Sequence, residues 1–365
     1  MVLYLYAGAK RKADLKHYLL KHCKAKKLAL KMVEVDILRN KVRGDLMNKQ
    51  RRGYFLARAR RGDFDAIFTS PPCGTFSRAR WANDVGPKPL RLARFPRGFP
   101  WLTGSQKQGV EQANVHVDFS ADILRIQFKR DNEAVGIMEH PEDLGAVHSG
   151  DHPGSAWQFN NIKDLVDLPG VTWGALLQSD WGRPYPKPTR LLGRLGGLVE
   201  LFSEGPPEFD KDGFYLGPAP KAQGVPAMVI GKNKMGDFNS TATAAWPPKL
   251  CDALAKQVVA HFLANNGKAQ EKGEDRQAVG QHRQPRLRQE GEEPPVPPEL
   301  PPELPRRQEE QQAARSCLPG EVELEQGLPV QVATSRRTLS SSEKRDLRAG
   351  RSIEGVYVGR PSVWG

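Results

Sequence analysis

The sequence has little cysteine and no long apolar run. It contains four cysteines in 365 residues, and none of them forms a C-x-x-C pair, so neither a zinc site nor a disulfide framework is indicated. No stretch approaches the ~20 apolar residues that cross a bilayer, and the apolar start is too short for a secretory signal. These absences exclude a membrane-spanning or disulfide-stabilised secreted protein. We therefore expect an intracellular protein, in the nucleus or cytoplasm.

Acidic residues are outnumbered, and the formal net charge is +13. Clustered Lys and Arg gain affinity for nucleic acids by releasing counterions from phosphates. This balance favours a nucleic acid, DNA or RNA, as the partner. The alternative is a soluble protein whose basic surface binds nothing specific.

Apolar runs alternate with helical patterns in the first part of the chain. Strands are predicted at 2–7, 28–37, 63–73 and 134–140, and helices at 13–28, 119–132 and 247–263. Such alternation predicts an α/β fold with a mostly parallel sheet, whose ligands bind at the carboxyl ends of the strands. The stretch 146–250 is rich in Gly and Pro, which predicts loops and short strands.

The composition changes after residue 265, which we take as the end of one domain, 1–265. Residues 266–345 are charged and rich in Pro, Glu, Arg and Gln. Such a composition buries too little apolar surface to offset the entropy of ordering, so a disordered linker is predicted there. Residues 346–365 follow as a separate segment.

Cys73 lies in the most informative stretch, SPPCGTFS, directly after a predicted strand. The thiolate is the nucleophilic form, and loops at strand ends supply N–H groups and cations that lower a thiol pKa. Arg78 and Arg80 are the nearby cations in the sequence. The alternative is a small, buried, inert cysteine. The placement favours a nucleophile.

Pro71-Pro72-Cys73 with Phe76-Ser77 resembles the nucleophile motif of the DNA cytosine-5 methyltransferases. Further segments resemble that family in its usual order, up to residue 263. They are Tyr6-Ala7-Gly8, Asp36, Gly44-Asp45-Leu46, the stretch IMEHPEDLG with Glu139, the stretch 180–193, and the stretch 238–258. The resemblance implies a Rossmann-like fold of the S-adenosylmethionine-dependent methyltransferases, and methyl transfer to carbon 5 of cytosine in DNA.

The resemblance also implies a role for each matching residue. Cys73 adds to carbon 6 of the ring, Glu139 acts at N3, and Lys187 and Arg190 orient the base and the Cys73 loop. S-adenosylmethionine is bound by Tyr6, Ala7, Gly8, Asp36, Asp45 and Pro71. The nucleic acid is contacted by Ser77, Arg78 and Arg80, and no metal is expected. A target base in a duplex is flipped out of the stack.

The sequence departs from the family pattern in several places. The first turn, AGAKRKADL, lacks the second glycine pair, and His140 replaces the usual Asn. Tyr185 stands in place of Gln, and Lys187 and Thr189 stand in place of two arginines. About 195–236 remains for a reduced target-recognition region, which predicts low sequence specificity.

The last segment, GVYVGRPSVWG at 355–365, resembles the opening of a small domain of unknown function. The resemblance stops within that motif. Because one short strand does not fold alone, we expect a truncated gene model or a fragment of a longer polyprotein, such as that of a mobile element. The alternative is a chance apolar ending.

Two other functions stay open at this point. Ser70-Pro71-Pro72 also resembles the motif of the amino-group (N4/N6) methyltransferases, although Cys73 replaces the aromatic residue on which their target base stacks. The second is a catalytically inactive Rossmann-like module that binds nucleic acid, which the unusual first turn favours.

Overall fold

Four apolar runs form the parallel part of a six-stranded sheet. They are β1 (Val2–Leu5), β2 (Met32–Val35), β3 (Ala66–Thr69) and β4 (Val135–Pro141), each close to a predicted strand. The computed structural model describes residues 1–81, 87–130, 133–147, 149–204, 208–211, 215–217 and 243–277. The strand order is β2-β1-β3-β4-β6-β5, so the carboxyl ends of the first four strands share one edge.

Two strands in the region predicted to hold loops and short strands complete the sheet. They are β5 (Thr172–Leu177) and β6 (Pro188–Arg194), and β6 runs antiparallel to both of its neighbours. A side chain at Gly193 would overlap the backbone oxygen of Gly136 on β4. The glycines that weaken the strand pattern in the sequence are therefore what lets β6 approach β4.

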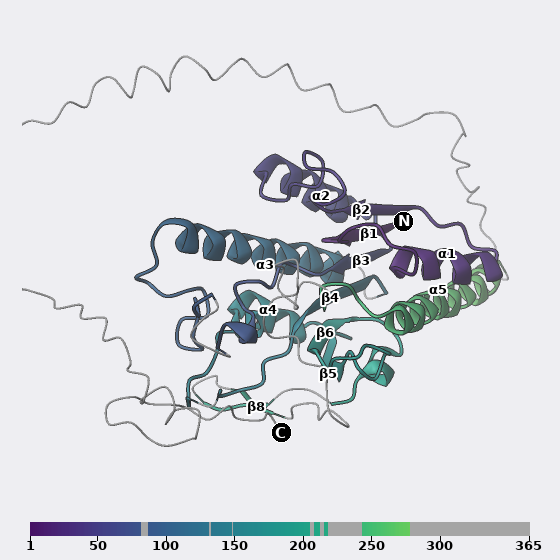
Figure 1. The fold of residues 1–365 in the computed structure, drawn as a ribbon. Coiled ribbons are helices and arrows are strands. Elements are labelled where there is room, and N and C mark those ends of the chain that lie inside the picture. Colours follow the sequence, from purple (N-terminus) through teal and green to yellow (C-terminus); the bar gives the residue numbers. More distant parts are fainter. Residues whose placement is uncertain are drawn as a thin grey trace, which may run out of the picture. The chain divides into compact units, whose positions relative to one another are not determined.

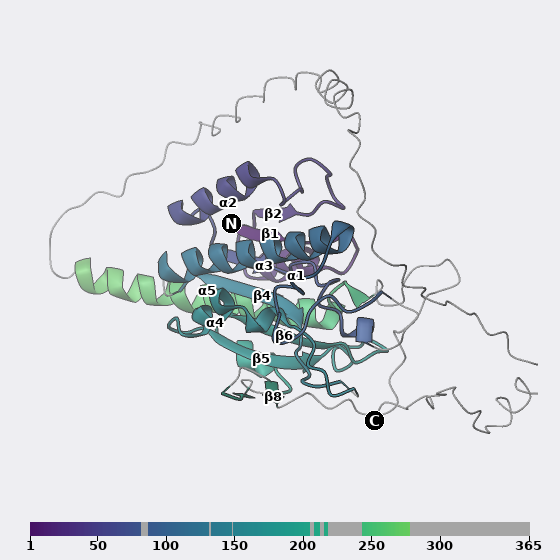
Figure 2. The same cartoon turned by 90° about the vertical axis from the view of Figure 1, so that its left-hand side faces the viewer.

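Helices cover both faces of the sheet (Figures 1 and 2). One face packs against α1 (Leu15–Ala25) and α5 (Pro248–Gln277), which lie side by side. The other packs against α2 (Lys49–Arg61), α3 (Gly104–Arg130) and α4 (Asn160–Val166). The predicted α/β fold class with a mostly parallel sheet is confirmed.

Four helices differ from the prediction. The helices α2 and α4 were not predicted: α2 buries only Phe55 and Ala59 among many arginines, and α4 is a short helix of 7 residues in the stretch expected to hold loops and short strands. The helix α3 begins well before residue 119, and its added turns bury Val110, Ala113 and Val117 at helical spacing. The helix α5 continues past residue 265 to Gln277, over a stretch with several good helix formers.

The remaining described elements are short: η1 (Arg78–Trp81), η2 (Ala156–Gln158), η3 (Leu198–Leu201), and a small sheet of β7 (Glu208–Phe209) and β8 (Tyr215–Gly217). The elements η3, β7 and β8 lie in the predicted target-recognition region. The predicted linker beyond Gln277 and the segment 346–365 lie outside the described residues. Among the described helices, none is both long and apolar enough to span a bilayer.

Candidate active site

The predicted site residues follow neighbouring parallel strands at the shared edge. The segment 6–8 follows β1, Asp36 follows β2, the stretch 70–80 follows β3, and Glu139 lies near the end of β4. Because β2, β1, β3 and β4 are consecutive neighbours, these segments meet at the carboxyl edge of the sheet. This is the edge at which the α/β prediction placed the ligands.

The turn after β1 is fixed by the end of β2. The Gly8 N–H donates to Asp36 Oδ2 at 2.8 Å, and Arg39 Nε donates to the Gly8 oxygen at 2.7 Å. Arg39 is itself paired with Glu34 at 2.9 Å. Tyr6 and Gly8 adopt positive φ angles of 59° and 68°. The turn thus keeps a defined shape without the second glycine pair, and it brings Gly8 and Asp36 together.

Tyr6 and Ala7 anchor this turn to its neighbours. The Tyr6 hydroxyl lies 3.2 Å from His116 Nδ1 and donates to the His116 oxygen at 3.3 Å, which joins β1 to α3. The Tyr6 and Ala7 N–H groups both donate to the Val35 oxygen of β2, at 2.8 and 3.3 Å. Burial lowers the pKa of His116 to about 4, and the nearby Arg52 adds to this effect, so the ring is neutral at pH 7.

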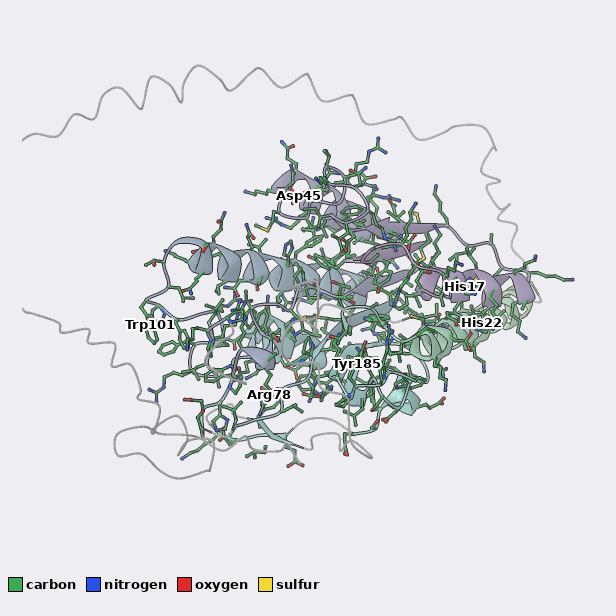
Figure 3. All side chains as sticks on the ribbon, in the orientation of Figure 1. His17, His22, Asp45, Arg78, Trp101 and Tyr185 are labelled. Atoms are coloured by element: carbon green, nitrogen blue, oxygen red, sulfur yellow. The ribbon has the colours of Figure 1, made fainter. Side chains whose placement is uncertain are left out.

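The segment 44–46 packs against the same strand end. A side chain at Gly44 would overlap the backbone oxygen of Asp36, so glycine is needed for this close approach. Asp45 Oδ1 accepts the Met47 N–H at 2.8 Å, and Figure 3 shows Asp45 next to α2. Two large apolar side chains beside Asp36 are exposed, Ile37 at 54% and Leu38 at 72%.

Cys73 lies half-buried in the loop after β3. Pro71 is buried, and the Phe76 N–H donates to the Cys73 oxygen at 2.9 Å, which closes a tight turn. Burial raises the pKa of the Cys73 thiol; Lys187 opposes this rise and Glu139 adds to it. The cation that acts on the sulfur is therefore Lys187, and the net direction is upward.

Lys187 connects three parts of the site. Its Nζ lies 3.8 Å from Glu139 Oε1 and donates to the Thr243 oxygen, just before α5, at 2.8 Å. The two side chains are 13% and 7% exposed. Glu139 Oε1 is buried and has no hydrogen-bond partner in the described part of the chain. The structure thus brings together Cys73, Glu139 and Lys187.

Arg78 and Arg80 do not act on the thiol. Arg78 donates to the backbone oxygens of Gly145 and Ala146, at 2.7 and 2.6 Å, and Arg80 donates to that of Gly74 at 2.8 Å. The expectation that these arginines lower the pKa of Cys73 is wrong: burial raises this pKa, and the cation that opposes the rise is Lys187. Ser77 is half-buried just before η1.

Arg190 lies on the other face of the sheet. It pairs with His140 across β4 and β6, one position along from Glu139, and successive strand residues face opposite sides. Its Nη2 and Nε donate to Glu142 Oε1 at 2.6 and 3.0 Å, and both side chains are sealed from solvent. The structure therefore groups Arg190 with Glu142 rather than with Cys73.

The comparison with known proteins gives a distant likeness in structure. No family model and no curated protein matches the sequence. Among solved structures, the chain is similar to the Dnmt2 methyltransferase of S. pombe, at 16% identity and a TM-score of 0.29, with 56% of each chain covered. The chain thus matches little more than half the length of that protein. At this distance, the likeness assigns no residue a role.

Two residues near the nucleophile loop were not selected from the sequence. His140 is buried edge-on against Phe76, with ring centroids 5.0 Å apart, and burial lowers its pKa to about 3. The guanidinium carbon of Arg91 lies 3.8 Å from the centroid of the Phe76 ring, and Arg91 donates two hydrogen bonds to Thr75 Oγ1, at 3.0 and 3.2 Å. The position of His140 directly after Glu139 was a usable signal, whereas Arg91 had none.

Proposed function

We propose that residues 1–265 transfer a methyl group from S-adenosylmethionine to carbon 5 of cytosine in DNA through a covalent adduct at Cys73. The observation that carries this proposal is the meeting of the Cys73 thiol with Glu139 and Lys187 at the carboxyl edge of the sheet. The residue Cys73 is half-buried rather than sealed in the core. A thiol flanked by a carboxyl group and a cation suits addition to an electron-poor ring.

Each group has a defined part in the chemistry. The Cys73 thiolate adds to carbon 6 while Glu139, in its protonated form, donates a proton to N3, which makes carbon 5 nucleophilic. After methyl transfer, the proton on carbon 5 leaves to a solvent base, and the electron pair of the C6–S bond returns to the sulfur. Glu139 then takes its proton back from N3. Cys73 leaves as a thiolate, so the enzyme is regenerated.

The electrostatics of the free protein support this sequence of events. Glu139 raises the pKa of Cys73 and Lys187 lowers it. When Glu139 carries the proton that it shares with N3, its negative charge is lost and Lys187 acts alone on the sulfur. Binding of the base therefore favours the thiolate at the moment when it is needed.

The residues at the ends of β1 and β2 fit the cofactor. The two Asp36 oxygens accept the N–H groups of Gly8 and Leu38, both at 2.8 Å, and each oxygen keeps a second acceptor position for a ribose hydroxyl. The exposed Ile37 and Leu38 offer an apolar surface for adenine. When bound, S-adenosylmethionine supplies an electrophilic methyl group. Tyr6, Ala7, Asp45 and Pro71 complete this proposed site.

The nucleic acid would meet the loop that carries Cys73. Ser77, Arg78 and Arg80 are half-exposed in this loop. The net charge of +13 supports a polyanionic partner. We assign these three residues to backbone contacts, with the two arginines also shaping the loop.

Covalent trapping tests the proposal. In a duplex that contains 5-fluorocytosine, fluorine replaces the hydrogen of carbon 5, so the proton loss that would release Cys73 cannot occur. In the presence of S-adenosylmethionine, the protein should therefore form a covalent adduct that survives denaturing gel electrophoresis. Cys73→Ser should abolish the adduct, and Cys23→Ser, at a buried thiol on α1, should retain it. An adduct that persists in Cys73→Ser contradicts the nucleophile assignment. Methyl transfer that tolerates Cys73→Ser indicates amino-group methylation, and no transfer by the wild-type protein indicates an inactive module.

A further inference from the structure

Three aromatic side chains gather in the loop between η1 and α3. The rings of Phe99 and Trp101 are stacked, with centroids 4.8 Å apart and planes at 9°, and Phe95 meets both edge-on at 6.3 and 5.7 Å. Trp101 is nevertheless 64% exposed. Phe99 covers one face of the indole, and Figure 3 shows Trp101 at the N-terminal end of α3, at the left margin of the molecule. A planar surface is thus held open to solvent.

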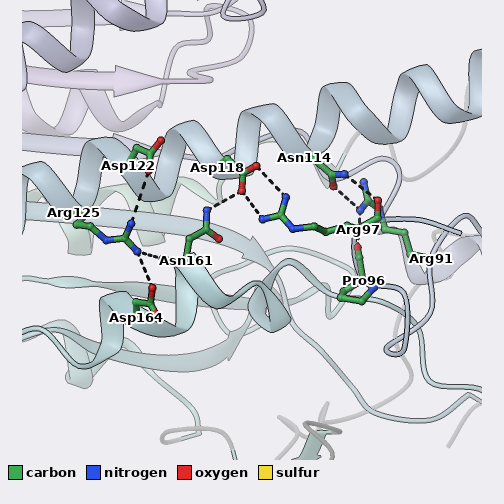
Figure 4. Close-up of polar contacts among 9 residues, drawn as sticks. All are labelled: Arg91, Pro96, Arg97, Asn114, Asp118, Asp122, Arg125, Asn161 and Asp164. Atoms are coloured by element: carbon green, nitrogen blue, oxygen red, sulfur yellow. Dashed lines mark hydrogen bonds and ion pairs between the residues drawn. The ribbon is translucent and has the colours of Figure 1, made fainter. Parts of the chain in front are cut away.

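The loop that carries these rings is fixed by polar contacts (Figure 4). Arg91 donates to the Pro96 oxygen at 2.6 Å and to Asn114 Oδ1 on α3 at 2.8 Å. Arg97 forms a two-pronged pair with Asp118, at 3.0 and 2.8 Å. Gly98 has a φ of 108°, and a side chain there would overlap that of Val110. A ligand that stacks on Trp101 therefore meets a preformed surface, which lowers the entropy cost of binding.

The loop that carries these rings is basic. The segment 87–107 contains five Lys or Arg residues and no Asp or Glu. Arg91 is buried, and Arg97 and Lys107 pair with Asp118 and Glu111 of α3, whereas the Arg94 side chain is exposed. An exposed aromatic ring in a loop with an exposed cation suits a ligand with both planar rings and negative charge.

The aromatic loop is bonded directly to the Cys73 loop. Arg80 donates to the Gly74 oxygen at 2.8 Å and to the Lys88 oxygen at 3.0 Å. Arg91 adds its two hydrogen bonds to Thr75. A strand held on the aromatic loop would therefore be held by the segment that also positions the nucleophile.

We propose that Trp101 is a stacking platform for an unpaired base of a single-stranded nucleic-acid segment, with Arg94 against its phosphates. The base must be unpaired, because a duplex hides the faces of its bases. A protein partner is less well matched, since the exposed apolar surface is one ring pair among cations rather than a broad patch. The inference rests on the proposed function, from which it takes a nucleic acid as the partner. It adds that the bound segment is single-stranded and that it binds at Trp101.

Binding of a fluorescein-labelled single-stranded oligonucleotide of mixed sequence to the full chain, followed by anisotropy, tests the platform. Trp101→Ala should weaken the affinity about fivefold or more, as expected for the loss of one stacked base. Trp101→Phe should stay within about twofold of the wild type, because phenylalanine retains a stacking face. Leu20→Ala removes an exposed apolar side chain of α1 and is the control, with no expected change.

Two outcomes overturn the platform. The first is that Trp101→Ala binds the single-stranded oligonucleotide as tightly as the wild type does. The second is that Trp101→Ala loses as much affinity for a blunt duplex as for the single strand. An interaction of Trp101 with a protein partner would give the first result. Binding does not require the thiol, so Cys73→Ser should bind as the wild type does. A Trp101 effect without any 5-fluorocytosine adduct contradicts the proposed chemistry alone. An adduct without a Trp101 effect contradicts the platform alone.

Discussion

Two ion pairs join the ends of β4 and β6, and they differ in tightness and in access to solvent. Arg190 and Glu142 form hydrogen bonds as short as 2.6 Å, and their side chains are 1% and 0% exposed. Lys187 and Glu139 are 3.8 Å apart, partly accessible, and close to a thiol. A sealed pair held by short hydrogen bonds has little freedom to exchange partners, whereas a loose pair can transfer its interaction to a ligand. We take this difference to separate a structural pair from the pair that we propose for the chemistry.

The largest expected effect compares the two glutamates. Glu139→Gln should lower the single-turnover rate of methyl transfer by about 10²- to 10⁴-fold, because the amide cannot donate the proton to N3. Its midpoint of denaturant unfolding should change little, since Lys187 keeps its bond to the Thr243 oxygen. Glu142→Gln is the matched control: it should lower the midpoint of unfolding and leave the rate of methyl transfer close to that of the wild type. If the Glu142 variant lost more transfer than the Glu139 variant at equal folded fraction, the comparison would be wrong.

The structure brings the predicted residues Glu139 and Lys187 together, whereas it pairs Arg190 with a residue that was not predicted. Cys73 was singled out because it directly follows an apolar strand, and Glu139 and Asp36 were named from the family resemblance; all three lie at the shared edge of the sheet. Arg190 was grouped with Cys73 from a motif, although the alternation of strand side chains places it on the face of His140. A motif match gives an order along the chain but does not fix the face of a strand.

Other parts of the site depend on contacts between distant segments. Arg91 connects Thr75, Pro96 and α3, and nothing in its sequence neighbours indicates burial. The strand β6 was expected only as one of several short strands without bounds, because Gly193, required by the close approach of Gly136, weakens its pattern. Composition and periodicity report local preferences, and these features are set by packing.

The next effect concerns the pH dependence of stability. Burial raises the pKa of Glu142 to about 7, even though Arg190 opposes the rise, and the ordinary value in an unfolded chain is about 4.3. Between these values, the folded protein binds more protons than the unfolded chain. The free energy of unfolding should therefore fall as the pH rises through this window, by up to about 3 kcal/mol, and level off above about pH 7.

Guanidinium unfolding of the wild type and Glu142→Gln at pH 5 and pH 8 measures this contribution. The wild type should lose more stability than the variant between the two pH values, because the amide does not titrate. Burial also raises the pKa of Asp143, and the charge of Asp143 raises that of Glu142, so the difference between the two proteins measures Glu142 together with its coupling to Asp143. Equal losses in both proteins would show that Glu142 stays ionised throughout and that the sealed pair does not respond to pH.

The smallest effect is on the Cys73 thiol itself. Lys187→Met should raise the pKa of Cys73 further, because it removes the cation that opposes the effect of burial. Glu139→Gln should lower the same pKa, because it removes a negative charge. The rate of alkylation by iodoacetamide as a function of pH, measured in a Cys317→Ser background, reports the change, since Cys23 and Cys251 are buried. Alkylation at pH 8 should then be slowest in the lysine variant and fastest in the glutamate variant.

The matched controls are Arg190→Met and Glu142→Gln. In both, the pKa of Cys73 should stay close to that of the wild type, because that pair lies on the opposite face of the sheet. Shifts of equal size from both pairs would mean that the two faces are not electrostatically separate, and the distinction between a chemical and a structural pair would not hold.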